Sequence, residues 1–330
     1  TQTSFRIELS EDSKTLDEVV VVGFGTQKKV NLTGAVTSVD TKALASRPVS
    51  QVGQALQGVV PGLNLSTPDL GGQLGQTMNV NIRGTGTIGK GSSASPLILI
   101  DGMEGNMNNL NPEDIENISV LKDAASSSIY GSRAAFGVIL ITTKKGKAGK
   151  MQVNYNNSFR YSGPTSLPNQ LDSYRFANYF NDAAINQGGS VIFDEETIDR
   201  IQKYMAGEIT TTTIANGTNW HFHEKANDNV NWWKKHFQWA WSNEHNISLN
   251  GGTEKLQYYV SGSYLNQDGN LRYGNDNYKR YNATAKVNTQ INKYVDFNIN
   301  TKFVRFDLDN PVYLEEGGLL YHDIARMWPM

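Results

Sequence analysis

The segment around residue 222 has the chemistry of a metal site. His221, His223 and Glu224 stand within four positions of one another, and imidazole nitrogens and carboxylate oxygens are common zinc ligands. No further ligands are spaced to match, and a chain without cysteine offers no thiolate. The sequence therefore favours a surface loop with incidental histidines, and no metal or other cofactor is predicted.

A glycine-rich stretch at residues 84–90 has the spacing of a nucleotide-binding loop. Gly84, Gly86 and Gly89 fit GxGxxG, and Lys90 nearly completes a phosphate loop. Both kinds of loop place backbone N–H groups and a helix N-terminus at a phosphate, so a helix must follow directly. Here Gly91 follows Lys90, and Ser-Ser-Ala-Ser-Pro then leads into an apolar strand. Nucleotide binding is therefore not predicted.

The remaining polar residues offer no catalytic set. Carboxylate pairs occur at residues 113–114 and 195–196, but their spacing assigns no acid and no base. No Gly-x-Ser-x-Gly nucleophile elbow is present. A net charge of −2 gives no case for a nucleic-acid partner. Neither an enzyme nor a nucleic-acid-binding protein is predicted.

The residues around the glycine loop predict a small mixed α/β module. Apolar segments at 80–82, 97–100, 118–121 and 137–143 are typical of strands. Asn111 and Pro112, followed by two acids, signal the start of a short helix. Small residues at 124–130 predict another helix. Upstream, 36–39 and 63–65 predict strands, and 51–56 predicts a polar helix.

After residue 149 the chain alternates apolar and polar residues. About five strands are predicted, at 151–161, 239–250, 256–264, 281–291 and 295–303. A soluble β-sandwich also alternates. Tyrosine and tryptophan near strand ends, opposite a face rich in Asn, Gln and Ser, favour a transmembrane β-barrel with aromatic girdles and a wet lumen.

The connections between these strands alternate in length, as turns and loops of a barrel do. Residues 251–254 and 292–294 are tight, whereas 162–238 and 266–280 are long. The first long loop predicts helices at 173–186 and 194–205, and residues 312–330 predict a further loop with a short helix. No apolar run approaches the roughly 18–20 residues of a membrane helix.

Near the N-terminus, four consecutive valines follow two acids and end at a glycine. β-Branched residues fit a pleated strand and resist a helix. Val19 to Val22 could form an ordinary buried strand, or they could lend a backbone edge to the sheet of a partner. Pattern alone does not separate these two interpretations.

Several long motifs, in order, resemble the plug domain of TonB-dependent outer-membrane transporters, closest to the SusC/RagA-like branch of Bacteroidota. They are VNIRG at 80–84, LILIDG at 97–102, NPEDIE at 111–116, VLKDA at 120–124 and IYGSRAA at 129–135, with TKKG at 143–146. The resemblance extends from about residue 16 to near the C-terminus. It implies a location in the outer membrane of a Gram-negative bacterium.

This resemblance implies an α+β plug domain inside the start of a large antiparallel transmembrane β-barrel of about 22 strands. Residues 1–15 would be the end of a carboxypeptidase-regulatory-like domain, 16–26 the TonB box and linker, and 27–148 the plug. Residues 149–330 would supply the first barrel strands and extracellular loops. Because five strands cannot close a barrel in lipid, the wall is expected to continue beyond Met330.

The family resemblance also implies a function and partners. Members import nutrients, most often oligosaccharides and in some cases peptides, beneath a SusD-like lipoprotein lid, and a dimer of such transporter–lipoprotein pairs is one arrangement. Three alternatives remain: a stand-alone receptor, a signal transducer with an N-terminal signalling domain and, least favoured, an outer-membrane enzyme.

The resemblance also implies a segment that binds TonB as an added strand. This segment comprises Asp17, Glu18, Val19, Val20, Val21, Val22 and Gly23.

Five further residues are candidates for gating or for substrate binding. Arg83 ends a strand inside the polar lumen implied by the family, and Asp101 starts a turn, so both are expected to hold the plug in place; simple solvated charges are the alternative. Trp220, Trp232 and Trp233 could stack on sugar rings. Packing beneath the loop is the favoured interpretation for these tryptophans, because their bodies are usually buried.

Overall fold

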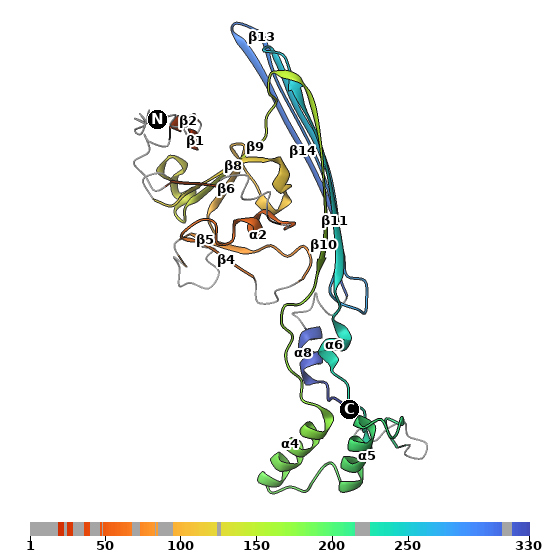
Figure 1. Ribbon diagram of the computed structural model, residues 1–330. Coiled ribbons are helices and arrows are strands. Elements are labelled where there is room, and N and C mark those ends of the chain that lie inside the picture. Colours follow the sequence, from red (N-terminus) through yellow and green to blue (C-terminus); the bar gives the residue numbers. More distant parts are fainter. Residues whose placement is uncertain are drawn as a thin grey trace, which may run out of the picture.

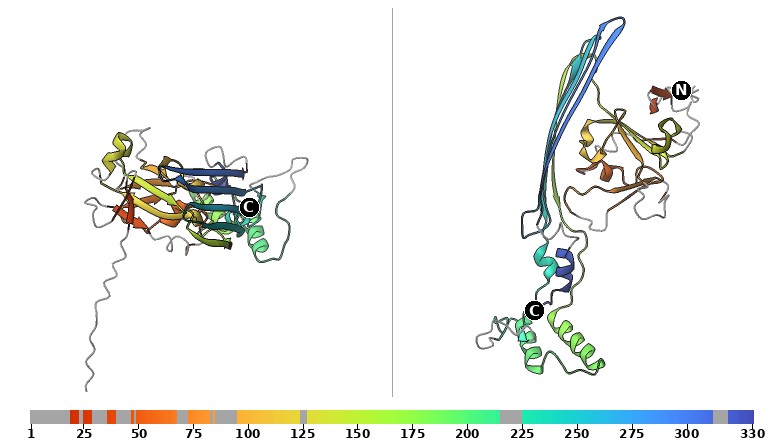
Figure 2. Two further views of the ribbon diagram at one scale, coloured as in Figure 1. Left: turned by 90° about the horizontal axis from the view of Figure 1, so that it is seen from above. Right: turned by 180° about the vertical axis from the view of Figure 1, so that it is seen from behind.

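The computed structural model describes residues 19–22, 25–28, 36–39, 47, 49–67, 73–82, 84, 95–123, 127–214, 225–311 and 319–330. These residues form an N-terminal α+β domain that lies beside a long five-stranded sheet (Figure 1). Helices and loops extend from one end of this sheet, and tight turns close the other end (Figures 1 and 2). Within the described residues, no helix is long and apolar enough to cross a membrane.

The N-terminal domain is built on a mixed sheet with the strand order β3-β8-β9-β6-β7. Its strands are β3 (Val36–Val39), β6 (Leu97–Ile100), β7 (Met103–Glu104), β8 (Ile115–Leu121) and β9 (Val138–Thr143). The β6 and β9 strands are parallel, and the other pairs are antiparallel. A separate pair joins β4 (Leu63–Ser66) to β5 (Asn79–Ile82).

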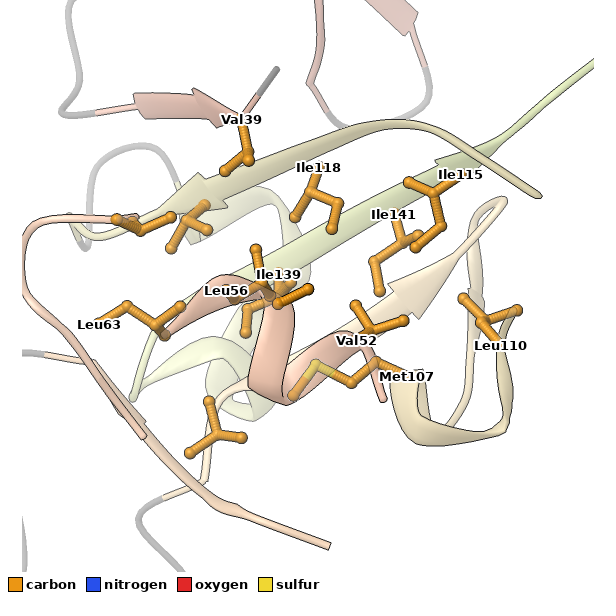
Figure 3. Close-up of a cluster of buried hydrophobic side chains, with 14 of the residues drawn as sticks. Val39, Val52, Leu56, Leu63, Met107, Leu110, Ile115, Ile118, Ile139 and Ile141 are labelled. Carbon is orange, nitrogen blue, oxygen red and sulfur yellow. The ribbon is translucent and has the colours of Figure 1, made fainter. Parts of the chain in front are cut away.

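Apolar side chains cover both faces of this sheet. One cluster packs α2 (Val52–Leu56) and Met107 against Ile118, Ile139 and Ile141 (Figure 3). A second cluster, which includes Leu99 and Leu140, covers the opposite face. Each fully buried aliphatic side chain contributes about 1.5–3 kcal/mol. The domain therefore has a core of its own.

A tight turn joins β6 to β7. Asp101 and Gly102 have φ of 49° and 88°, and the flanking residues Ile100 and Met103 pair with each other. Two consecutive positive φ angles are the signature of a type I′ hairpin turn, for which Asp-Gly is a preferred pair. The turn presents the Asp101 side chain toward the long sheet.

The long sheet is antiparallel, with its strands in sequence order. It comprises β10 (Gly149–Ser162), β11 (Ala240–Gly252), β12 (Leu256–Asp268), β13 (Asn277–Asn292) and β14 (Val295–Asp309). Alternate residues of β10 face away from the N-terminal domain, and Met151, Val153, Tyr155, Phe159 and Tyr161 are each more than half exposed. Near the loop end, the Tyr161 ring stacks on Trp239 and lies tilted against Trp241, at ring distances of 5.3 and 4.7 Å.

The loops at the other end of the strands contain helices that pack together. These are α4 (Ser173–Asn186), α5 (Glu195–Met205), α6 (Trp232–His236) and α8 (Leu319–Arg326). The Trp328 ring inserts among Phe176, Phe180 and Phe193, with centroids 5.2–5.7 Å away. The loop after β14 is thus fastened to the loop between β10 and β11.

Most predicted elements are confirmed, and two of the short helices are of the 3-10 kind. Of the helix predicted at 124–130, residues 124–126 lie outside the described residues, Ser127 is helical, and the chain continues as a 3-10 helix, η4 (Ser128–Ala134), with a kink at Gly131, where φ is 66°. The helix signalled by Asn111 is a single 3-10 turn, η3 (Pro112–Asp114), because the next residues already form β8. Residues 1–15, expected to end a carboxypeptidase-regulatory-like domain, lie outside the described residues.

Candidate functional site

Buried polar contacts join the N-terminal domain to the long sheet, and Asp101 forms the contact nearest the tight turns. Its carboxylate accepts hydrogen bonds from the backbone N and the Oγ1 of Thr143, at 2.9 and 2.7 Å. From the long sheet, Lys302 Nζ, Lys286 Nζ and Asn300 Nδ2 lie 2.6, 3.0 and 3.0 Å from Asp101 Oδ2. Burial alone would raise the pKa of Asp101, but bonds from Lys302 and Thr143 and the charge of Lys286 hold that pKa well below its ordinary value.

Asp114 forms the next contact along the strands. Tyr259 donates to its Oδ1 at 2.8 Å, and Ser261 and Thr284 donate to its Oδ2 at 2.9 and 3.3 Å. Asn111 sits beside it, caps η3 through the Glu113 backbone N–H, and exchanges side-chain amide hydrogen bonds with Asn246 of β11. A buried carboxylate is tolerated here because hydroxyl donors replace water.

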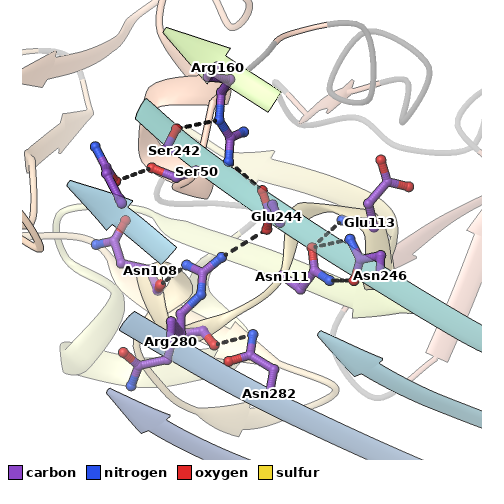
Figure 4. A network of polar contacts seen from close by, with 12 residues as sticks. Ser50, Asn108, Asn111, Glu113, Arg160, Ser242, Glu244, Asn246, Arg280 and Asn282 are labelled. Carbon is purple, nitrogen blue, oxygen red and sulfur yellow. Dashed lines mark hydrogen bonds and ion pairs between the residues drawn. The ribbon is translucent and has the colours of Figure 1, made fainter. Parts of the chain in front are cut away.

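Glu244 and Arg280 form a third contact, toward the loop end (Figure 4). Arg160 Nη2 and Arg280 Nη2 lie 2.7 and 3.4 Å from the two oxygens of the Glu244 carboxylate. Arg280 Nη1 also donates to the Asn108 carbonyl at 3.1 Å, and the Arg280 side chain is only 1% exposed. The arginine thus links the long sheet to the turn of η2 (Met107–Asn109).

These contacts between the N-terminal domain and the long sheet are mainly polar. Removing one partner of a buried ion pair costs about 3–5 kcal/mol of stability, because the other charge stays buried without a partner. Separating the pair so that water hydrates both charges costs far less. The one apolar cluster crossing the interface among the described residues is small, formed by Leu74, Leu265 and Tyr278. Separation of the N-terminal domain from the long sheet would therefore expose little apolar surface.

A cavity of about 430 Å³ opens at the loop side of this interface. Amide side chains dominate its lining, namely Gln51, Gln54, Gln57, Gln73, Gln76, Gln267 and Asn270. The Oε1 atoms of Gln51 and Gln76 are buried without a hydrogen-bond partner. No charged residue appears among the described residues of the lining, so the cavity suits a neutral ligand that donates hydrogen bonds.

The structure describes only some of the residues predicted to act at a site. Asp101 lies at the interface, and its role in gating stays a prediction, whereas Arg83 lies outside the described residues. Within the expected TonB segment, Val19–Val22 form β1, which pairs with β2 (Gly25–Lys28). This hairpin lies at the end of the N-terminal domain that faces the tight turns (Figures 1 and 2). Asp17, Glu18 and Gly23 are outside the described residues.

The tryptophans are partly described. Trp232 Nε1 donates to the Trp328 carbonyl at 2.5 Å, and Lys235 lies over its ring. Trp233 stacks on Phe237 at 5.9 Å. Trp220 lies outside the described residues, as do His221, His223 and Glu224. In the part of the chain that is described, no three His, Cys, Asp or Glu side chains form a metal-binding group.

Sequence reasoning did not identify Asp114, Glu244, Arg280, Lys286 and Lys302 as interface residues. One signal could have found them, because each of the last four is a charged residue at an inward position of an alternating strand. A charge at such a position needs a partner from whatever fills the lumen.

Comparison with known proteins agrees with this geometry. Residues 28–138 match the TonB-dependent Receptor Plug Domain. The chain is 32% identical to the TonB-dependent receptor SusC of Bacteroides thetaiotaomicron, covering 90% of this chain and 27% of SusC. It is 31% identical to the TonB-dependent receptor P3 of Formosa agariphila, covering 91% of this chain and 26% of P3.

Among solved structures, the chain resembles the RagAB peptide importer in its open-open state. The TM-score is 0.72 at 30% identity, covering 90% of this chain and 33% of the other. The chain spans about a quarter of the length of the curated relatives it matches. Receptors of this kind lie in the outer membrane of Gram-negative bacteria. The N-terminal domain is therefore a plug and the long sheet part of a barrel wall, and the chain belongs to the SusC/RagA-like TonB-dependent receptors.

Proposed function

We propose that the receptor containing this chain imports a nutrient across the outer membrane with energy delivered by TonB. The observation that carries the proposal is the way the plug is held. It has its own apolar cores, and it meets the wall mainly through ion pairs and hydrogen bonds to residues such as Asp101, Asp114 and Arg280. A plug held in this way can be pulled or remodelled and then reseated.

The pull would act through Asp17–Gly23. TonB would add a strand to the β1 segment, so that main-chain hydrogen bonds carry the affinity. Ligand at the outer face of the plug would favour release of this segment into the periplasm, as a population shift. The position of the β1–β2 hairpin at the tight-turn end supports this proposal, because tight turns of outer-membrane barrels face the periplasm.

For the cargo we propose an oligosaccharide, with a peptide as the second candidate. The glutamine-lined cavity supports both, because amide side chains bind hydroxyl groups and peptide N–H groups alike. The similarity to the RagAB peptide importer favours the peptide. Stacking of a sugar ring on Trp220, Trp232 or Trp233 would favour the oligosaccharide.

We further propose a SusD-like surface lipoprotein as the partner, with a dimer of such pairs as the assembly. Residues 1–15 would close a carboxypeptidase-regulatory-like domain, 16–26 would be the TonB box and linker, 27–148 the plug, and 149–330 barrel strands and loops. The protein would act by transport and not by catalysis.

Purification from native outer membranes tests the partnership with a lipoprotein. A lipoprotein in near-equal amount is expected, and recovery of the barrel alone would favour a stand-alone receptor.

Deletion of residues 17–22 in the full-length receptor tests the transport mechanism. Uptake of fluorescently labelled oligosaccharide and oligopeptide mixtures is measured in the native host, beside binding of the same mixtures to isolated outer membranes. We expect uptake to be lost while binding remains. The mixture that wild-type cells accumulate identifies the class of cargo, and unchanged uptake by the deletion variant contradicts the mechanism.

A further inference from the structure

Three donors of the barrel wall converge on a single oxygen atom of the plug. Lys302 Nζ, Lys286 Nζ and Asn300 Nδ2 all lie within 3.0 Å of Asp101 Oδ2. Lys286 and Asn300 face each other across β13 and β14, and Lys302 is two residues further along β14. The three side chains therefore form a cluster on the lumen face of the wall, with the plug supplying the carboxylate.

The charges in this cluster do not balance. Within the described residues, Asp101 is the one acid in an ion pair with either lysine. Lys286 is nearly buried, with 5% of its side chain exposed, and its Nζ also donates to the Thr143 carbonyl at 3.1 Å. Two ammonium groups thus share one carboxylate. If the plug moves, the wall keeps both cations and an amide donor already directed at one point.

We infer that Lys286, Asn300 and Lys302 form a carboxylate-binding site on the barrel wall, which Asp101 occupies at rest and a carboxylate of the cargo occupies when the plug yields. The inference rests on the proposed import function. Cationic donors that converge on an oxygen make strong, charge-assisted hydrogen bonds. The chemistry fits the terminal or side-chain carboxylate of a peptide and the carboxylate of an acidic sugar.

Removal of the resident carboxylate tests the site in the purified full-length receptor. Asp101 has a φ of 49°, which glycine adopts without strain, so Asp101→Gly empties the site and leaves the turn intact. Acetate is then added, with acetamide as the neutral control of the same shape and sodium chloride as the control for ionic strength. We expect acetate to raise the Tm of the variant by about 3 °C, saturably, and neither control to do so.

A second substitution assigns this effect to the wall. Adding Lys302→Met to Asp101→Gly should abolish the response to acetate, whereas adding Lys279→Met should not. Lys279 is the matched control because it lies on β13 next to Arg280 and so faces away from the lumen. A Tm that responds equally to acetate and acetamide, or a response that survives Lys302→Met, overturns the inference.

Asp101→Asn provides the same test if the glycine variant does not fold. Asparagine tolerates a positive φ and leaves both ammonium groups without an anion, so a smaller rise with acetate is expected, and its absence overturns the inference. Galacturonate and N-acetylglycine, added to the same variants, distinguish an acidic sugar from a peptide carboxylate. The measurement needs neither TonB nor uptake, so failure of the import proposal would appear separately, as uptake that survives deletion of residues 17–22.

Discussion

At the residue scale, the seating of the plug depends on acids whose charge is satisfied by the wall. Asp114 is 5% exposed, and its carboxylate accepts hydrogen bonds from three hydroxyl groups of two wall strands, β12 and β13. Its removal would leave these hydroxyl groups without their acceptor. An uncompensated buried polar group costs about 1–3 kcal/mol.

Substitution of Asp114 should therefore loosen the plug in a graded way. Asp114→Ala is expected to lower the opening free energy of the β8 and β9 amides by about 2–3 kcal/mol, and Asp114→Asn, which keeps one acceptor, by about 1 kcal/mol. Hydrogen exchange of the full-length receptor measures both. Asp199→Asn is the control, because Asp199 makes an exposed i,i+4 pair with Lys203. Equal exchange in Asp114→Ala and Asp199→Asn would contradict this account.

In the loops, the stability of α5 should depend on pH through Asp194. Its carboxylate pairs with Lys225 and accepts a hydrogen bond from the Thr197 N–H at the start of the helix. These contacts lower the pKa of Asp194 from an ordinary 3.8 to about 2. A folded-state pKa below the ordinary value gives stabilisation that is complete above about pH 4 and is lost as the pH falls toward 2.

Pepsin cleavage of the loop helices measures this dependence, because pepsin is active in that range. Asp194→Asn should be cleaved faster than wild type near pH 4, and the two rates should converge as the pH approaches the folded-state pKa of Asp194, about 2. A ratio of the two rates that does not change with pH would rule out the titration of Asp194 as the cause.

At the element scale, local signals predict most of the secondary structure. The helix predicted at 173–186 is observed as Ser173–Asn186, because the Asp172 side chain accepts a hydrogen bond from the Arg175 N–H and fixes the first turn. The predicted wall strands are observed with mostly longer bounds. In β14 the prediction ends at residue 303 because the following apolar residues, Val304, Phe306 and Leu308, lie on the opposite face and break the alternation.

Long-range pairing could not be predicted in the same way. Asp101 meets Lys302 across 201 positions, and Asp114 meets Ser261 across 147. Such pairs depend on the register of the wall and on the seating of the plug, and neither leaves a local periodicity. The sequence marked Asp101 only because it starts a turn, and it gave no sign that Trp328 packs between α4 and α5.

The loop helices should separate when Trp328 is removed. Trp328→Ala deletes the ring that packs on Phe176, Phe180 and Phe193, so protection of the α4 amides should fall by about 3 kcal/mol in hydrogen exchange. Tyr179→Ala is the matched control on the same helix, because Tyr179 is 66% exposed. Similar protection in both variants would mean that the two loops are not coupled through this ring.

Backbone donors of β1 should govern affinity for TonB. Val20→Pro and Val21→Pro each remove one main-chain N–H, and the alternation of a strand means that one of the two faces the partner. Loss of one such hydrogen bond, about 1 kcal/mol, should weaken binding of the TonB C-terminal domain about fivefold in one of the variants. Val20→Ala and Val21→Ala keep the N–H and should bind nearly as wild type. Unchanged affinity in both proline variants would exclude strand addition at this segment.

At the scale of the whole molecule, the plug is a folded domain seated against a surface of matching polarity. Its apolar clusters are internal, while its contacts with the wall run from the Arg280 pair near the loops to the Asp101 pair near the tight turns. Little apolar surface is therefore in contact between the plug and the wall. Movement of the plug therefore requires hydration of polar groups and not the opening of a core.

The most direct test fastens the plug to the wall and measures uptake. The chain has no cysteine, so Asn111→Cys with Asn246→Cys introduces one pair of thiols at a plug–wall contact, and a short, cleavable bifunctional thiol reagent links them. We expect crosslinked cells to bind labelled cargo without accumulating it, and cleavage of the link to restore uptake. Each single-cysteine variant, treated alike, should transport normally. Uptake at the wild-type rate through a fully crosslinked receptor would contradict the claim that the plug must move.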